Sequence, residues 1–122
     1  MGYYSDVALS MYKKDYNKMV ELNKENEDFN DLIRIANKRT YTGDEDVVTL
    51  YWESVKWHTA FPEIGTIEDY LRILVEQDRP YNFIRIGEDW DDVEYNYHYS
   101  DTVDSNIVID KISLYRAINI DE

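Results

Sequence analysis

The sequence predicts an α+β fold: a mostly antiparallel sheet of about five strands with two to three helices packed on one face, in the order β-αα-β-α-β-β-β. Three observations predict it. Several segments alternate apolar and polar residues with the period of two that is typical of strands. Two segments repeat apolar residues at the three- and four-residue spacings of an amphipathic helix. The helices interrupt an otherwise sequential run of strands, which favours an antiparallel sheet.

The most regular stretch is residues 81–99, which we expect to form a hairpin. Residues 81–86 and 93–99 both alternate and are rich in aromatic and β-branched residues. Between them lies an acidic turn that begins at Gly87, where glycine permits a positive φ. The alternation places Tyr95, Tyr97 and Tyr99 on one face of the second strand, either the inner or the outer face of the sheet.

The N-terminal part begins with a half-buried strand at residues 3–11, followed by a helix at residues 13–24. Asn26 is suited to cap a second helix, with acidic residues in its first turn, so we expect either two short helices or one kinked helix. That helix is expected to end near Lys38 and Arg39, because bases are favoured at a helix C-terminus. Residues 40–46 are then expected to form a turn.

Residues 47–57 predict a strand that is apolar on both faces. Val48, Leu50 and Trp52 share one face, and the other face is the position expected for Val47, Tyr51, Val55 and Trp57. A connector containing Pro62 follows.

A third helix is expected to begin with Thr66 as its N-cap, in a variant of the capping box with Asp69. It shows a clear apolar stripe and should end at Arg79-Pro80. After the hairpin, residues 106–118 predict a last strand. Its apolar phase changes at Asp110-Lys111, which indicates a bulge.

Length and composition indicate one domain, residues 1–122, without disulfides, because the chain has no cysteine. Neither a signal peptide nor an apolar run long enough to span a membrane is recognisable, so we expect a cytoplasmic protein.

The formal net charge is −13, and the acidity is concentrated in the second half of the chain. Residues 1–60 carry 11 acids against 8 bases, whereas residues 61–122 carry 15 against 5. Direct binding to nucleic acid requires a cationic face and is therefore not expected. An acidic surface instead favours a basic protein partner, although acidity can also serve solubility alone.

The expected contact site is the turn of the hairpin. It comprises Glu88, Asp89, Trp90, Asp91, Asp92 and Glu94. The acids would meet lysine or arginine, and the tryptophan resembles a binding hot spot. The alternative is a solvated turn that keeps a sheet edge from pairing with other chains, with the tryptophan folded back onto the sheet.

No motif for catalysis, phosphate binding or dinucleotide binding is present, so we expect no enzyme activity and no cofactor. His58 and His98 are the only histidines and the only candidates for a general base. The acids of the hairpin turn are ligands of the kind that calcium prefers, but their spacing is not that of an EF-hand, and no metal site is expected.

Twelve tyrosines and three tryptophans favour an interface, because tyrosine combines a large contact area with a polar tip. Together with carboxylates, such rings imitate nucleic acid crudely. The alternative is that most of them pack in the core and on the sheet.

Three stretches, MGYYSDVAL (1–9), LYWESVKW (50–57) and YNFIRIGEDWDDVEY (81–95), resemble a family of short proteins encoded by bacteriophages and prophages. The resemblance covers most of the chain and implies no assigned activity or site residue. It implies a genomic setting in which small acidic proteins block host defence enzymes, for example as anti-CRISPR proteins, several of which resemble DNA in charge.

The leading hypothesis is therefore a non-enzymatic protein that binds and inhibits a basic host protein or nucleoprotein complex of a defence system. One alternative is a small ligand-binding or hydrolytic module that uses His58 or His98 beside carboxylates in a cleft. Another is a phage structural or assembly component that self-associates. The sequence leaves the oligomeric state open, a dimer included.

Overall fold

The computed structural model describes residues 4–42, 46–58, 60–89 and 91–99. It confirms the α+β class. The elements follow the chain as β1 (Ser5–Tyr12), α1 (Lys13–Leu22), α2 (Glu27–Ile35), β2 (Asn37–Tyr41), β3 (Val47–Val55), α3 (Pro62–Glu76), β4 (Tyr81–Ile86) and β5 (Val93–His98).

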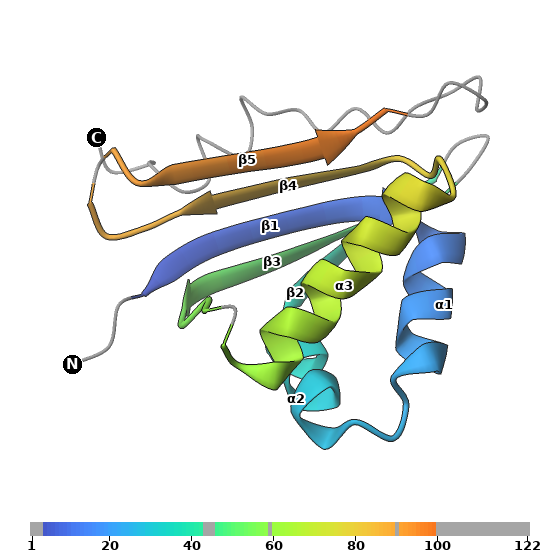
Figure 1. Cartoon of the computed structure of the whole chain (residues 1–122), viewed down its shortest axis with the longest axis horizontal. Helices are drawn as coiled ribbons and strands as arrows, with labels where there is room; N and C mark the ends of the chain where they lie inside the picture. Colours follow the sequence, from blue (N-terminus) through green and yellow to red (C-terminus); the bar gives the residue numbers. More distant parts are fainter. Residues whose placement is uncertain (1–3, 43–45, 59, 90, 100–122) are drawn as a thin grey trace.

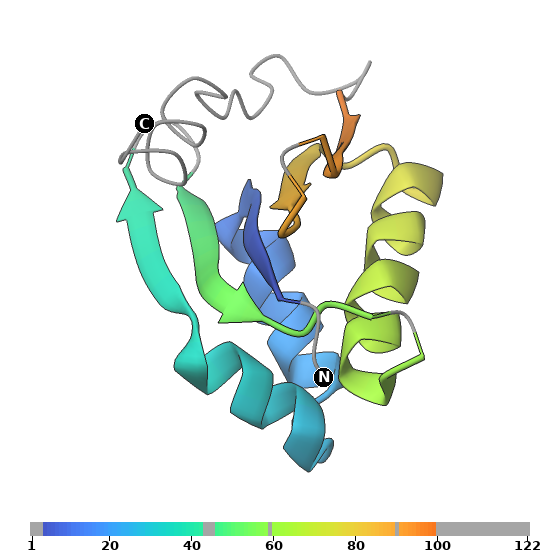
Figure 2. The same ribbon diagram turned by 90° about the vertical axis from the view of Figure 1, so that its left-hand side faces the viewer.

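The strands form a five-stranded sheet in the order β2-β3-β1-β4-β5, and all neighbouring pairs are antiparallel. β1 lies at the centre, between β3 and β4. The three helices lie on one face of the sheet (Figure 1), and α3 follows the side on which β4 and β5 lie (Figure 2). The arrangement of helices that the sequence predicted is thus confirmed.

The main core lies between the helices and the sheet. From β1 it takes Val7, Leu9 and Met11, all at most 1 % exposed. β3 contributes Val48, Leu50 and Trp52, as its alternation predicted, and the helices contribute Met19, Phe29, Leu32, Ile64, Ile67, Leu71 and Leu74. A smaller cluster of Ala8, Ile84, Ile86 and Tyr51 lies on the sheet face that carries no described helix.

The second helix begins where the sequence predicts. The side chain of Asn26 accepts a hydrogen bond from the Phe29 backbone N–H (3.1 Å), which confirms its role as N-cap. The helix ends at Ile35, however, and Lys38 and Arg39 belong to β2. The predicted turn at residues 40–46 therefore begins too early, and β2 was missed.

The reason for this error lies in the composition of β2. Its sequence, NKRTY, has no apolar alternation, and residues 37–40 are exposed. Among the strands that the structure describes, β2 pairs with β3 alone, so backbone hydrogen bonds to β3 define it rather than burial of side chains.

The third helix begins four residues before the predicted N-cap. Pro62 occupies the first helical turn, where the missing N–H costs nothing and the fixed φ suits the helix. Thr66 is inside the helix, and its hydroxyl donates a hydrogen bond to the Pro62 carbonyl (2.9 Å). The predicted capping box of Thr66 and Asp69 is therefore wrong, because the proline that seemed to belong to a connector starts the helix.

A Schellman motif ends α3. Asp78 has a φ of 55°, its N–H donates to the Val75 carbonyl, and the Arg79 N–H donates to the Leu74 carbonyl. Pro80 follows, as predicted for a chain that leaves a helix.

A β-bulge in β3 changes which side chains face the core. Opposite Asp6 of β1 lie two residues of β3, Glu53 and Ser54, and Ser54 has a φ of 53°. The Asp6 carboxylate accepts a hydrogen bond from the Ser54 N–H (2.8 Å). The extra residue reverses the alternation, so Val55 and Trp57 pack against the main core, on the same side as Trp52 and not on the opposite face as predicted.

The strand predicted at residues 106–118, with its bulge at Asp110-Lys111, lies outside the described residues.

Candidate functional site

The acidic turn between β4 and β5 is closed by its own backbone. The Gly87 N–H donates to the Asp92 carbonyl (2.8 Å), and the Asp92 N–H donates to the Asp89 carbonyl (2.9 Å). Glu88, Asp89 and Asp91 are exposed on this turn. Trp90, which we predicted as the hot spot, lies outside the described residues.

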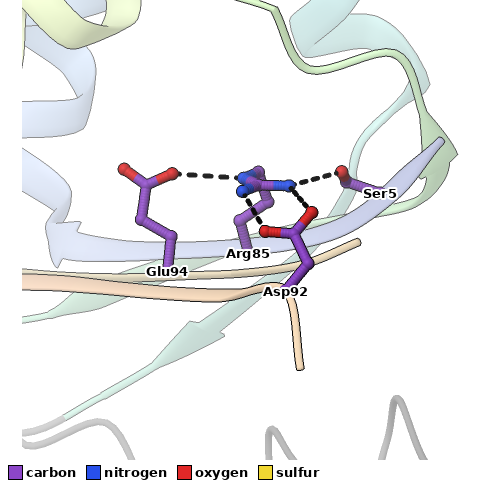
Figure 3. A network of polar contacts seen from close by, with 4 residues as sticks. All are labelled: Ser5, Arg85, Asp92 and Glu94. Carbon is purple, nitrogen blue, oxygen red and sulfur yellow. Dashed lines mark hydrogen bonds and ion pairs between the residues drawn. The ribbon is translucent and has the colours of Figure 1, made fainter. Parts of the chain in front are cut away.

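Two of the predicted contact residues bind an arginine of the same hairpin (Figure 3). The two terminal nitrogens of Arg85 donate to the Asp92 carboxylate at 2.8 and 3.2 Å, and its Nε donates to Glu94 at 3.1 Å. The guanidinium also donates to the Ser5 hydroxyl of β1 (3.0 Å). Glu94 is the direct cross-strand partner of Arg85, so the register of the hairpin brings the pair together.

The arginine of this network is more buried than its two carboxylate partners. The Arg85 side chain is only 16 % exposed, whereas Asp92 and Glu94 are 32 % and 48 % exposed. The hydrogen bond to Asp92 is the main cause that raises the pKa of Arg85, and burial opposes it. Asp92 and Glu94 therefore balance an internal cation, a role that sequence reasoning missed because it considered Arg85 only as a strand residue.

Two further carboxylates lie near this network. Glu88 accepts a hydrogen bond from the Tyr4 backbone N–H, which ties the turn to the start of β1. Burial, followed by the negative charge of Glu94, raises the pKa of Glu68 on α3. Asp89 and Asp91, like Glu88, have exposed side chains on this turn.

The second prominent feature is a row of three tyrosines on β5, defined here as the tyrosine ladder: Tyr95, Tyr97 and Tyr99. Successive ring centroids are 5.2 and 5.0 Å apart, with tilted planes. Tyr97 and Tyr99 are 52 % and 47 % exposed. The alternation predicted that these rings share one face of the strand, but it did not determine whether this is the inner or the outer face of the sheet.

Cross-strand register decides which face the ladder occupies. Tyr95 and Tyr97 lie opposite Ile84 and Asn82, whereas Asn96 lies opposite the core residue Phe83. The ladder is therefore on the face that carries no described helix. Tyr95 anchors it through a hydrogen bond from its hydroxyl to the Asn82 side chain (3.3 Å). The pKa of Tyr95 is raised by burial and then by the neighbouring Tyr99.

The two histidines lie in different settings and are not brought together. His58 is exposed, and its Nδ1 accepts a hydrogen bond from the Ala60 N–H (3.0 Å) in the turn before α3. Nε2 of His98, near the end of β5, lies 2.9 Å from a carboxylate oxygen of Asp78. This carboxylate is within the hydrogen-bond reach that the alternative hypothesis required.

The His98–Asp78 pair joins β5 to the end of α3, next to a buried ion pair. Arg79 donates from Nε to both carboxylate oxygens of Asp15 (3.0 and 3.2 Å), and Asp15 is 6 % exposed. The Tyr70 hydroxyl donates to the Asp15 backbone carbonyl (2.7 Å). These contacts connect α1, α3 and the following loop, so the surroundings of His98 also have a structural role.

Within the part of the chain that the structure describes, no group of three histidine or acidic side chains is placed to hold a metal ion. None of the described helices has the length and apolar character needed to cross a membrane. No family model, curated protein or solved structure matches this chain.

Proposed function

We propose that this chain is a non-enzymatic binding protein that recognises a cationic surface of another protein. The observation that carries the proposal is the exposure of Asp89 and Asp91 on a hairpin turn that the backbone and the Arg85 network hold in shape. A turn that is closed by hydrogen bonds loses less conformational entropy on binding than an open one, and its charge attracts a basic partner over several ångströms.

The partner class follows from charge. Proteins that handle nucleic acids carry the cationic faces that an acidic surface complements, and a net charge of −13 favours encounter with them. The resemblance to small proteins of phages and prophages adds a setting, inhibition of a host defence complex. In this proposal the chain occupies the partner's nucleic-acid site and competes with DNA or RNA there.

The test is capture of partners from a bacterial lysate on the tagged full chain, at low and at moderate salt, followed by competition with duplex DNA. We expect to recover one basic protein in stoichiometric amount. Its binding should be weakened by salt, and duplex DNA should displace it. The test variant is Asp89→Asn with Asp91→Asn, which removes two charges and keeps side chains that suit turns. Asp92 and Glu94 are left intact because they bind Arg85.

The matched control is Glu25→Gln with Glu76→Gln. Both residues are exposed on other parts of the surface, and the net charge changes by the same amount. Loss of the partner in the Asp89/Asp91 variant, with retention in the control, supports the proposal. Equal retention in both variants, or no partner at either salt, contradicts it.

A second candidate is a small hydrolytic or ligand-binding module, and the His98–Asp78 distance of 2.9 Å is the observation that favours it. A carboxylate that orients a histidine is a common element of general-base catalysis. Screening wild type and His98→Gln against ester, phosphoester and metabolite panels tests it. A turnover or thermal shift that disappears in His98→Gln supports this candidate, and identical behaviour of the two proteins excludes it.

A further inference from the structure

The tyrosine ladder is a surface that the acidic turn does not explain. Tyr97 and Tyr99 expose about half of their surface. The strand β4, with which β5 pairs, is by contrast almost fully buried. Tyrosine at an exposed position supplies a large, rigid contact area with only two side-chain torsions to fix, which is why it is enriched in binding surfaces. The ring contacts and the Tyr95–Asn82 hydrogen bond hold the ladder in place before any partner arrives.

The position of β5 adds a second feature. β5 is the outer strand beyond β4 in the sheet formed by the described residues. An outer strand offers backbone groups to which an extended segment of another protein can pair. The side chains of such a segment alternate between the two faces, as those of β5 do, so every second residue would lie beside a ring of the ladder.

Charge indicates which side chains these would be. Residues 85–99 contain five carboxylates and one arginine, Arg85, which balances Asp92 and Glu94, so the hairpin keeps a net negative charge. Aromatic rings attract cations through their faces, and the guanidinium of arginine both stacks on a ring and pairs with carboxylates. The chain itself uses such contacts elsewhere, with Arg79 over the Tyr12 ring at 5.3 Å and Lys56 over the Tyr4 ring at 5.6 Å.

From these observations we infer that the tyrosine ladder is the docking surface for an extended, arginine-bearing segment of the partner, which adds to the β5 edge with alternate arginines on the rings. This inference rests on the proposed function and names the partner's chemistry at a surface next to the turn. The acidic turn attracts the partner from a distance, and the ladder gives the contact its preference for arginine over lysine.

A second copy of this chain is a poorer occupant of the same edge. Two chains of net charge −13 repel each other, which opposes the pairing of β5 with β5 of a second copy.

The inference is tested with two short synthetic peptides of equal charge, one alternating arginine with threonine and one alternating lysine with threonine. Their affinities for the full chain are measured by calorimetry at low and moderate salt. We expect the arginine peptide to bind more tightly, and the Tyr97→Leu/Tyr99→Leu variant to weaken its binding by about four- to twenty-five-fold, since each ring contributes about two- to fivefold. The Tyr97→Phe/Tyr99→Phe variant should stay within about twofold of wild type, because phenylalanine keeps the ring.

Phe61→Leu is the matched control, since Phe61 is an aromatic residue that is 38 % exposed but lies outside both the ladder and the acidic turn. Thermal unfolding of every variant verifies the fold. Equal binding of the arginine peptide by wild type and the Tyr97→Leu/Tyr99→Leu variant would overturn the ladder as a docking surface. If the Asp89→Asn/Asp91→Asn variant nevertheless bound this peptide more weakly than wild type, the proposed function would stand. The inference is also overturned if the wild-type chain binds neither peptide. It is overturned as well if sedimentation shows that the wild type is a dimer and that the Tyr97→Leu/Tyr99→Leu variant is a monomer.

Discussion

Arg85 lies between two carboxylates of its own hairpin, and this arrangement decides which acidic residues can serve a partner. Arg85→Met removes the cation from a site where its side chain is 16 % exposed and leaves Asp92 and Glu94 without their counter-charge. We expect the free energy of unfolding to fall by about 1–3 kcal/mol, less than for a fully buried pair because both acids are partly exposed.

Urea denaturation of Arg85→Met against Arg72→Met measures this loss. Arg72 pairs with Asp69 on the surface of α3, where the side chains are 73 % and 66 % exposed. Its replacement should change the free energy of unfolding by no more than about 0.5 kcal/mol. Similar values for the two variants would mean that the Arg85 network contributes nothing beyond an ordinary surface pair.

Tyr70 is the residue whose ionisation should weaken the fold at alkaline pH. Burial, and then the negative charge of Asp15, raise its pKa from 10.0 to about 12, and Arg79 opposes this shift. The unfolded chain loses the Tyr70 proton near pH 10 while the folded chain keeps it, so the unfolded state gains stability as the pH rises from 10 towards 12.

The free energy of unfolding should therefore decrease over that interval and change little from this cause below pH 10. Tyr70→Phe should be less stable at neutral pH by about 1 kcal/mol, since it lacks the hydrogen bond to Asp15, but should show a shallower alkaline loss. Chemical denaturation at a series of pH values compares the two proteins. Parallel alkaline profiles would show that Tyr70 is not the responsible group.

At the scale of elements, the bulge in β3 rests on a residue with an unfavourable backbone conformation. Ser54 has a φ of 53°, a region that costs a residue with a Cβ about 1–2 kcal/mol relative to glycine. Ser54→Gly should raise the melting temperature, and Ser54→Val should lower it. Thr40→Gly in the regular strand β2 is the control and should be destabilising by about 0.5–1 kcal/mol. A lower melting temperature of Ser54→Gly would contradict the conclusion that the backbone conformation of Ser54 is unfavourable.

The elements also show which sequence patterns are sufficient. Asn26 was identified correctly as a cap because its chemistry is local: one side-chain oxygen and one nearby N–H. β2 could not be identified, because its polar sequence shows no apolar alternation and its pairing with β3 alone marks it as a strand among the described residues. Pro62 suits both a connector and a first helical turn, and only the packing of α3 on the sheet distinguishes these two roles.

For the whole molecule, composition predicted the acidic character and alternation predicted the hairpin, but the function of each acid depended on register. Asp91 and Asp92 are adjacent and chemically identical, yet Asp91 is exposed whereas Asp92 binds Arg85. The same holds for the ladder, whose face became known only from the pairing of β5 with β4. Side-chain chemistry is a property of the sequence, whereas its availability is a property of the sheet.

The central place of β1 has a consequence for how the chain acquires its structure. β1 is synthesised before either of its neighbours, and its pairs with β3 and β4 join residues 35 to 50 and 70 to 80 positions apart. On a ribosome, an apolar strand with residues such as Leu9 must therefore wait until β4 has emerged before the sheet can close. Such distant contacts make folding slow, on the order of milliseconds to seconds, and expose the nascent strand to chaperones and to aggregation during that time.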